Sequence, residues 1–242
     1  MKIIDAVWEK RNLGMNVQEI LIESSDTENL FNEYKKTLTA SYQVLKIPVE
    51  KKEFMILAKK EGFEFVEMQF HSYGMLDIAA SIASDKKLQK QNIYCKKVKS
   101  DIIFNKVIEL VKLGIFTTDR IALDKSFGIE VSNRRYANWI NDLRIKQDTD
   151  LRVVYFNEEL IGFLIGTVSG NCYKALLGGV IPKYQGFLGF YVFGAIFREL
   201  AAEYKFLDVE YSSNNMPIVK LYQFFNFPIK QLSYVYTKHR SK

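Results

Sequence analysis

The chain has 242 residues and a mass of 28.2 kDa, and its 48% hydrophobic and 26% charged residues are typical of a folded globular protein rather than a disordered chain. Two cysteines, Cys95 and Cys172, stand far apart without metal-ligand spacing. We therefore expect neither a zinc site nor a disulfide framework, and a reducing cytoplasmic location fits best. The net charge of +6 is spread along the chain and interleaved with acids, which argues against nucleic acid and leaves phosphorylated small molecules as candidate ligands.

The N-terminal residues do not look like a targeting segment. Charges at Asp5 and Glu9 interrupt the sequence before the apolar core of a signal peptide could develop. The longest apolar stretch, residues 186–197, is too short to span a membrane. We therefore expect neither a signal peptide nor a membrane partner.

The first part of the chain alternates strand and helix patterns. Strands are expected over the following ranges: residues 17–22, 43–49 and 63–70. Asp26 is placed to cap a helix after the first strand, and a second helix over residues 51–61 ends at Gly62. We interpret residues 1–100 as a small α/β domain with a loose boundary in the lysine-rich segment 89–100.

The second part, residues 101–242, has a longer α/β pattern. One helix begins at Ser100 or Asp101 and stops at Gly114, and Ser132 can cap another that runs to residue 146. Three strands are expected next, over residues 151–156, 161–169 and 173–181. The pattern then reads helix, strand, helix and strand, over residues 189–204, 206–211, 216–224 and 229–237.

The junction after the third of these strands is a glycine-containing turn, residues 180–189 (VIPKYQGFLG). A buried strand that ends in such a turn and opens a helix offers unpaired backbone N–H groups and the positive end of the helix dipole. Both features favour a phosphate group. The alternative is a turn that needs glycine only for its geometry.

A second segment, residues 213–227, combines capping residues with a tyrosine. Asn215 is placed as an N-cap, and Pro217 lies in the first turn, where its missing N–H costs nothing. Asn226 tolerates the left-handed conformation that ends a helix. Tyr222 then lies on a short helix, where a tyrosine considered alone is more often a half-buried core residue.

In this order, the two segments resemble the GNAT superfamily of acyl-CoA-dependent N-acetyltransferases. The residues that match the family patterns are Val180, Pro182, Tyr184, Gln185 and Gly186 in the first segment and Asn215, Leu221, Tyr222 and Phe227 in the second. The resemblance implies an α/β GNAT fold with a mixed central sheet flanked by helices. It also implies that a smaller, partial GNAT-like domain, residues 1–100, precedes the acetyltransferase domain, residues 101–242.

The resemblance also assigns roles to residues. Tyr222 would protonate the departing thiolate, and acetyl-CoA would be the co-substrate without a metal. The end of the third strand would bond the pantetheine arm, and the amides of the turn would cradle the pyrophosphate. The cofactor-binding residues implied are Val180, Ile181, Gln185, Gly186, Phe187, Leu188, Gly189, Phe190 and Asn215.

Two residues of the turn depart from the family pattern. Leu188 and Phe190 stand where the family has glycines, and Gly189 is displaced between them. If those positions need a positive φ, a leucine there costs about 1 kcal/mol or more, and the turn is reshaped. The alternative function is therefore a GNAT-fold protein without catalysis that serves as a binding or assembly partner.

A finer resemblance, to the TDP-fucosamine acetyltransferases, rests on residues 116–120, 132–140 and 233–236 and on the small first domain. It implies an acceptor amine on a nucleotide-linked, TDP-type amino-deoxysugar. A peptide or another small amine is the alternative acceptor, and the sequence leaves a homodimer open. The candidate substrate contacts are Asp119, Arg120 and Tyr136. Capping or salt-bridge roles for the first two stay open.

No acidic residue stands on the third strand, where many relatives place a general base. Gly178 and Gly179 occupy that position. Water, or a tuned pKa of the acceptor amine, is the alternative to a base from the protein. His71 follows a predicted strand and is a further candidate base, although a lone histidine is more often a surface or core residue.

Overall fold

The computed structural model describes residues 1–240 except for the side chain of Phe187, and the chain divides into two compact units. Unit 1 consists of Met1–Phe70, Ser212–Asn214 and the described residues from Gln231 onward. Unit 2 consists of His71–Tyr211 and Asn215–Lys230. Neither unit is one continuous stretch of sequence.

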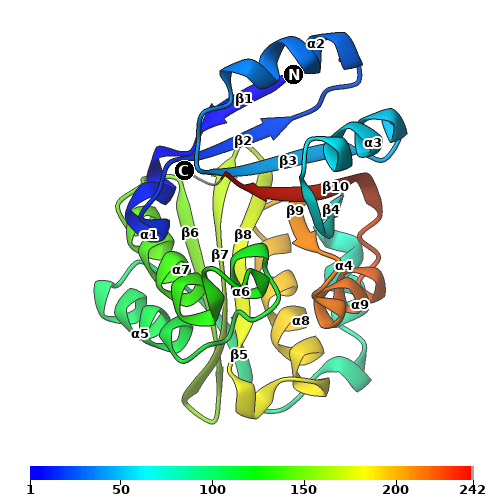
Figure 1. Ribbon diagram of the computed structural model, residues 1–242. Helices are drawn as coiled ribbons and strands as arrows, with labels where there is room; N and C mark the ends of the chain where they lie inside the picture. The colour runs from blue at the N-terminus through cyan, green and yellow to red at the C-terminus, as the bar shows by residue number, and fades with distance from the viewer. Residues whose placement is uncertain (241–242) are drawn as a thin grey trace. The chain divides into compact units, whose positions relative to one another are not determined.

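Unit 1 is a small α/β unit. Its strands are β1 (Lys2–Asp5), β2 (Val17–Leu21), β3 (Tyr42–Pro48), the first part of β4 (Glu64–Met75) and most of β10 (Ile229–His239), and its helices are η1 (Val7–Glu9), α1 (Lys10–Leu13), α2 (Glu28–Tyr34), η2 (Lys35–Thr37) and α3 (Lys52–Lys60) (Figure 1). Strands β2 and β3 are parallel, whereas β1 pairs antiparallel with β2 and β10 pairs antiparallel with β3. Phe31 of α2 and Phe54 of α3 pack on Ile20 and Leu45 of the sheet and form the core.

Unit 2 is a larger α/β unit. Its elements are the rest of β4, α4 (Leu76–Ala83), η3 (Lys86–Leu88), β5 (Ile93–Val98), α5 (Asp101–Lys112), α6 (Arg120–Leu123), α7 (Gly128–Arg144), β6 (Thr149–Phe156), β7 (Glu159–Ser169), β8 (Cys172–Val180), η4 (Pro182–Tyr184), α8 (Phe187–Ala201), β9 (Phe206–Ser212) and α9 (Met216–Phe224) (Figure 1). The strand order is β4-β9-β8-β7-β6-β5, with β8 and β9 parallel and the pairs from β5 to β8 antiparallel. The sheet is therefore mixed.

Helices cover both faces of the sheet in unit 2. Helices α5 and α7 pack with β6, β7 and β8 in one apolar cluster. A side chain on Gly178 would meet Phe193 of α8, whereas one on the next residue, Gly179, would meet Ile115 after α5. Since successive strand residues face opposite sides, α8 covers the other face. Within residues 1–240, every helix is too short or too polar to cross a membrane.

The boundary between the units differs from the one expected near residue 100. The lysine-rich segment contains β5, whose Ile93 lies opposite Phe156 of β6 in unit 2. Lysines suit this position because β5 is the edge strand of the sheet. The helix α4 also belongs to unit 2, where Arg198 Nη1 of α8 donates a hydrogen bond to the carbonyl of Ala83 at 2.6 Å.

Two predicted helix caps were wrong. Ser132 lies inside α7 rather than at its start, and its hydroxyl donates to Asp119 at 2.6 Å. Thr27, not Asp26, is the N-cap of α2, because the carboxylate of Asp26 instead binds the N-terminal ammonium group and the amide of Glu23. In both cases the side chain binds groups other than the backbone amides of the helix that it was expected to cap.

Candidate functional site

The two parallel strands of unit 2 stop pairing part-way along their length. Strands β8 and β9 are in register from Cys172 opposite Phe206 to Ala175 opposite Val209, and β8 then continues to Val180 without a partner on β9. On its other side β8 carries a bulge at Leu176, because Ala175 and Leu177 pair with adjacent residues of β7. A bulge bends and twists its strand, which explains why the ladder to β9 ends at this point.

Two backbone groups at the end of β8 already form hydrogen bonds within the protein. The amide of Ile181 donates to the carbonyl of Ile161 at 2.9 Å. The carbonyl of Val180 accepts a hydrogen bond from Gln185 Nε2 at 3.1 Å. A ligand that used the Val180 carbonyl would therefore need the side chain of Gln185 to move.

The turn that follows opens the long helix α8. Gly186 has φ +83° and ψ −128°, and α8 begins at the next residue, Phe187. The amide of Gln185 is bonded to Pro182 and that of Gly189 to Gly186, whereas the amides of Gly186 and Leu188 make no backbone hydrogen bond with the described residues. A Cβ built on Gly186 or Gly189 would meet nothing within 4 Å. Open space beside free helix amides suits a phosphate group.

Leu188 and Phe190 carry no backbone strain, contrary to the concern raised by the sequence. Both lie inside α8, and Gly186 is the residue of this turn with a positive φ. The Phe190 ring packs 5.0 Å from the ring of Phe224 and 6.4 Å from that of Phe225, so it joins α8 to α9. Leu188 and Phe190 therefore continue the helix, and Phe190 also packs against the end of α9.

The two glycines of the turn are expected to respond oppositely to alanine. Gly186→Ala should lower the free energy of unfolding by about 1–3 kcal/mol, because its backbone conformation is open mainly to glycine. It should also weaken the binding of acetyl-CoA, the co-substrate that the sequence resemblance implies, about tenfold, since the amides shift. Gly189→Ala should raise stability by about 0.5–1 kcal/mol, because Gly189 lies in the helix with free space around it. Chemical denaturation and calorimetry measure both, and equal effects at the two sites would contradict this account of the turn.

Tyr222 is held on α9 by caps that agree with the sequence prediction. Helix α9 spans Met216–Phe224, the side chain of Asn215 accepts from the amide of Ile218 at 3.4 Å, and Asn226 has φ +59°. Asn215 thus has a capping role in the structure. The amide of Phe227 donates to the carbonyl of Tyr222 at 2.9 Å and closes the end of the helix.

The Tyr222 side chain is buried, with 3% of its surface exposed. Its ring lies 4.9 Å from that of Tyr211 and 5.8 Å from that of Phe227. None of the hydrogen bonds among the described residues involves its hydroxyl. Burial, with a smaller contribution from Tyr211, raises the pKa of Tyr222 well above its usual value, so the phenol stays protonated at neutral pH.

Asp119 has a structural role in the fold. It is the N-cap of α6, where one carboxylate oxygen accepts from the amide of Ile121 at 2.9 Å and the other accepts from Ser132. Its carboxylate is therefore already satisfied, in agreement with the capping alternative. Arg120 begins α6, and the Tyr136 ring packs 4.4 Å from the ring of Phe116. A substrate role for these last two residues stays a prediction.

The strand β8 has no room for a base at the two glycines. A Cβ on Gly178 would lie 2.8 Å from Leu164, and one on Gly179 would lie 2.7 Å from Ile115. The neighbouring strand β9 carries two acidic residues instead, Asp208 and Glu210. They alternate with buried residues along the strand, so they face the side of the sheet opposite Tyr211. Acidic and apolar residues alternate over residues 206–211 (FLDVEY). This pattern indicates a strand with an acidic face, but the acids were not among the predicted site residues.

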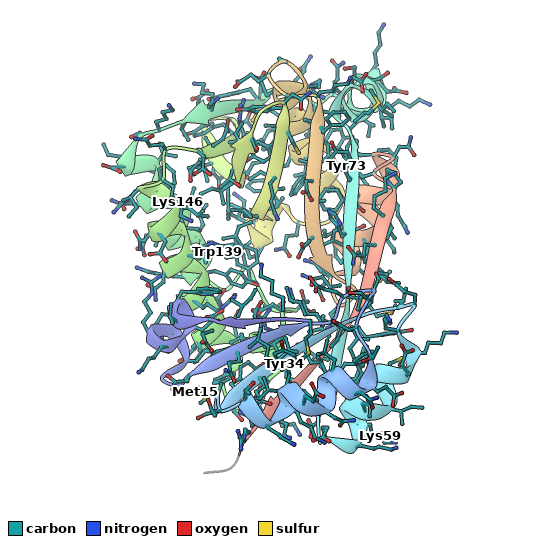
Figure 2. All side chains as sticks on the ribbon, turned by 90° about the horizontal axis from the view of Figure 1, so that it is seen from above. Met15, Tyr34, Lys59, Tyr73, Trp139 and Lys146 are labelled. Atoms are coloured by element: carbon teal, nitrogen blue, oxygen red, sulfur yellow. The ribbon has the colours of Figure 1, made fainter. Side chains whose placement is uncertain are left out.

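His71 is paired rather than isolated. Its Nε2 lies 2.7 Å from a carboxylate oxygen of Asp208 on β9. On the same two strands, Tyr73 of β4, labelled in Figure 2, stacks on Phe206 of β9 with ring centroids 5.1 Å apart. Glu210 is exposed and follows Val209, the last β9 residue that pairs with β8.

Among the described residues, no group of three or more His, Cys, Asp or Glu side chains is arranged to hold a metal ion.

Comparison of the whole structure with solved structures identifies its fold. A functionally unknown conserved protein from Staphylococcus epidermidis has a TM-score of 0.67 and 12% identity, with 93% of this chain and 85% of that chain covered. A GCN5-related N-acetyltransferase from Sphaerobacter thermophilus has a TM-score of 0.60 and 11% identity, with 98% and 75% covered. The chain has the GNAT fold.

Other comparisons add two findings. The tandem GNAT protein from the clavulanic acid biosynthesis pathway has a TM-score of 0.54 and 11% identity, and the match covers 93% of this chain and 76% of that one. No family model matches the sequence, and no curated protein matches it. The expected GNAT fold is therefore confirmed by structure, at identities that reveal the fold and not the substrate.

Proposed function

We propose that the protein is an acetyl-CoA-dependent N-acetyltransferase. The observation that carries the proposal is the end of the β8–β9 ladder at Ala175 and Val209, together with the start of α8 beyond the end of β8, where the amides of Gly186 and Leu188 make no backbone hydrogen bond with the described residues. Strands that part in this way leave room for an acyl chain between them, while the helix start favours its phosphates. The fold is shared with N-acetyltransferases, which supports the same interpretation.

The amides of Gly186 and Leu188, at the start of α8, would hold the pyrophosphate of acetyl-CoA, which supplies a thioester as acetyl donor. In the transfer, a neutral acceptor amine forms the new C–N bond, the C–S bond breaks, and the sulfur needs a proton. We assign that proton to the Tyr222 hydroxyl, because the sequence resemblance places the acid there and a phenol is protonated at neutral pH. The amine loses one proton to a base, so the overall charge balances.

The pKa values of the two cysteine thiols favour direct transfer of the acetyl group to the amine over transfer through an acylated cysteine. Burial raises the pKa of the Cys95 thiol to about 12. Burial also raises the pKa of Cys172, with Asp208 adding to the effect. The thiolate is the reactive form of cysteine, so both thiols are poor nucleophiles at neutral pH.

We propose Glu210 as the base, since it is the acid of β9 beyond the last paired residue and on the face opposite Tyr211. Glu210→Gln should lower kcat about tenfold and leave acetyl-CoA affinity unchanged. The effect is below the usual range for general bases because water can also accept the proton. His71→Gln is the matched test of the neighbouring candidate, and a larger loss of kcat there would transfer the role to the His71–Asp208 pair.

The acceptor we propose is the amine of a nucleotide-linked amino-deoxysugar. Support comes from the sequence resemblance and from the positive charge of the chain, which suits a diphosphate. A screen for thiol release with TDP- and UDP-amino sugars, peptides and simple amines identifies the acceptor. Turnover with a peptide alone would replace the sugar by a peptide acceptor.

Calorimetry with acetyl-CoA tests the proposed activity against its main rival, a GNAT-fold protein without catalysis. One observation favours the rival: the Val180 carbonyl is already bonded to Gln185. Binding that weakens about tenfold in Gly186→Ala supports the proposal. Absence of binding by the wild-type protein would favour the rival.

A further inference from the structure

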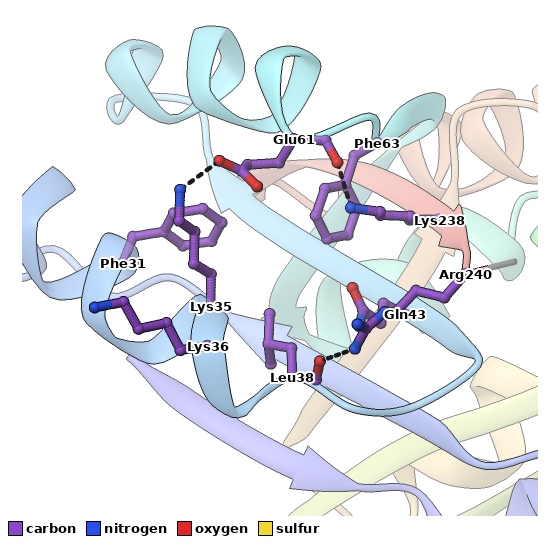
Figure 3. A pocket seen from close by; sticks show the side chains of 9 residues that line it. All are labelled: Phe31, Lys35, Lys36, Leu38, Gln43, Glu61, Phe63, Lys238 and Arg240. Atoms are coloured by element: carbon purple, nitrogen blue, oxygen red, sulfur yellow. Dashed lines mark hydrogen bonds and ion pairs between the residues drawn. The ribbon is translucent and has the colours of Figure 1, made fainter. Parts of the chain in front are cut away.

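Unit 1 contains a pocket of about 290 Å³ whose walls carry an excess of positive charge (Figure 3). Four cationic side chains line it: Lys35, Lys36, Lys238 and Arg240. One carboxylate, Glu61, also lines it. The cations come from η2 and from the last described residues at the end of β10, two segments about 200 positions apart in sequence that the fold brings together.

Hydrogen bonds to the main chain hold two of the cations in place. Lys238 Nζ donates to the carbonyl of Glu61, and Arg240 Nη1 donates to the carbonyl of Leu38. The amide of Arg240 is itself bonded to the carbonyl of Ser41 at 2.8 Å. A guanidinium has five N–H groups and an ammonium three, so each side chain keeps donors for a ligand.

The one carboxylate neutralises only one of the four cations. Lys35 Nζ lies 2.6 Å from Glu61 Oε1, and with this pair included the lining keeps a net formal charge of +3. Lys36 lies at the rim and makes no hydrogen bond or ion pair with the described residues (Figure 3). Like charges gathered around one hollow repel each other, and a bound anion would relieve that repulsion.

The floor of the pocket is apolar. Phe31, Leu38 and Phe63 line it, and each exposes 6% or less of its surface. The Lys238 ammonium lies 5.5 Å from the centre of the Phe63 ring. We propose that this pocket binds a phosphomonoester whose carbon portion is a ring, with Arg240 and Lys238 on the phosphate and the apolar floor beneath the ring.

The chemistry favours phosphate over a simple carboxylate. Arginine presents a planar fork of donors that matches two phosphate oxygens, and a dianion fits a net charge of +3 better than a monoanion. The volume lies just below the range usual for ligand pockets, about 300–1,000 Å³, so the ligand is small. The proposal is independent of acyl transfer, because all of its residues belong to unit 1.

Calorimetry at fixed ionic strength, without acetyl-CoA, tests the proposal with phenyl phosphate and inorganic phosphate. Phenyl phosphate should bind about fivefold more tightly, because its ring covers the floor. Arg240→Gln should weaken binding about tenfold or more, and Arg240→Lys should recover only part of the loss because it lacks the fork. Lys52→Gln, which removes an exposed lysine of the same unit outside the pocket lining, should bind like wild type.

A second variant protects the test against misfolding. Lys36 is exposed and makes no hydrogen bond or ion pair with the described residues, so Lys36→Gln should keep the melting temperature and weaken phosphate binding about threefold. Equal losses in Lys36→Gln and Lys52→Gln would mean that general surface charge, and not the pocket, attracts the anion. That result, or no binding by the wild-type protein, would overturn the proposal.

Discussion

Tyr222→Phe is expected to lower kcat about 100-fold or more while the dissociation constant of acetyl-CoA changes little. A CoA thiolate that leaves without a proton must carry a full negative charge, and a positioned phenol relieves that charge as the bond breaks. The substitution should not disturb folding, because no hydrogen bond among the described residues depends on the hydroxyl. Steady-state kinetics, calorimetry and the melting temperature, measured on one variant, separate these effects.

Tyr173→Phe is the matched control for Tyr222→Phe. Tyr173 is also fully buried, but its hydroxyl donates to the carbonyl of Asp150 at 2.9 Å, so its loss should cost about 1 kcal/mol of stability and leave kcat unchanged. If Tyr222 were only a core residue, its variant would show the same pattern as this control. An unaltered kcat across the pH range would remove Tyr222 from the mechanism.

The pH dependence of kcat gives an independent test of the same residue. Burial raises the pKa of Tyr222 above the usual value of about 10, so the acid form persists throughout the neutral and mildly alkaline range. The wild-type kcat should therefore show no fall from loss of this proton below about pH 10. A fall near pH 8 that disappears in Tyr222→Phe would contradict the assignment of a raised pKa.

Asp150→Asn is expected to lower the free energy of unfolding by about 3–5 kcal/mol, the range for breaking a buried ion pair. Asp150 and Arg152 are buried on β6, and both guanidinium–carboxylate hydrogen bonds are short, at 2.7 and 2.9 Å. Lys97 of β5 lies 2.9 Å from the same carboxylate. When Asp150 loses its charge, the buried Arg152 keeps one carboxylate partner, Glu203, at 2.9 Å. Urea denaturation measures the change.

The same carboxylate should make stability depend on pH. Burial alone would raise the pKa of Asp150, but hydrogen bonds from Arg152 and Lys97 outweigh it and leave that pKa below its usual value. The stabilising contribution is then complete above about pH 5 and is lost as the pH falls below about 4, through the folded-state pKa. Asp150→Asn should flatten this acid dependence.

An exposed ion pair provides the control for Asp150→Asn. Glu109 and Lys112 of α5 lie 2.8 Å apart with 68% and 54% of their side chains exposed. Glu109→Gln should change the free energy of unfolding by less than about 0.5 kcal/mol, because water already solvates both groups. A comparable loss in both variants would show that burial does not set the strength of the Asp150 network.

Local patterns in the sequence determined the elements that carry the site. The apolar run before the turn predicted β8, Asn215 and Pro217 predicted the start of α9, and Asn226 has the left-handed φ expected of a residue that ends a helix. Each of these signals acts within a few residues, through a cap, a fixed φ or a buried strand, so sequence alone can reveal them. The GNAT fold expected from the two motifs was confirmed by the comparison of structures.

Tertiary structure decided the features whose partners lie far away in the chain. Ser132 bonds Asp119 instead of capping a helix, and the lysine-rich β5 became a strand because β6 supplies its backbone partners. The departure of β8 from β9 depends on the bulge at Leu176, which only strand pairing reveals. Asp150 and Arg152 could not be placed in a buried network from sequence, because Lys97 reaches Asp150, and Glu203 reaches Arg152, from other elements. The local sequence indicates which secondary structures and hydrogen-bond partners are open to a residue, and contacts with distant parts of the chain decide which of them form.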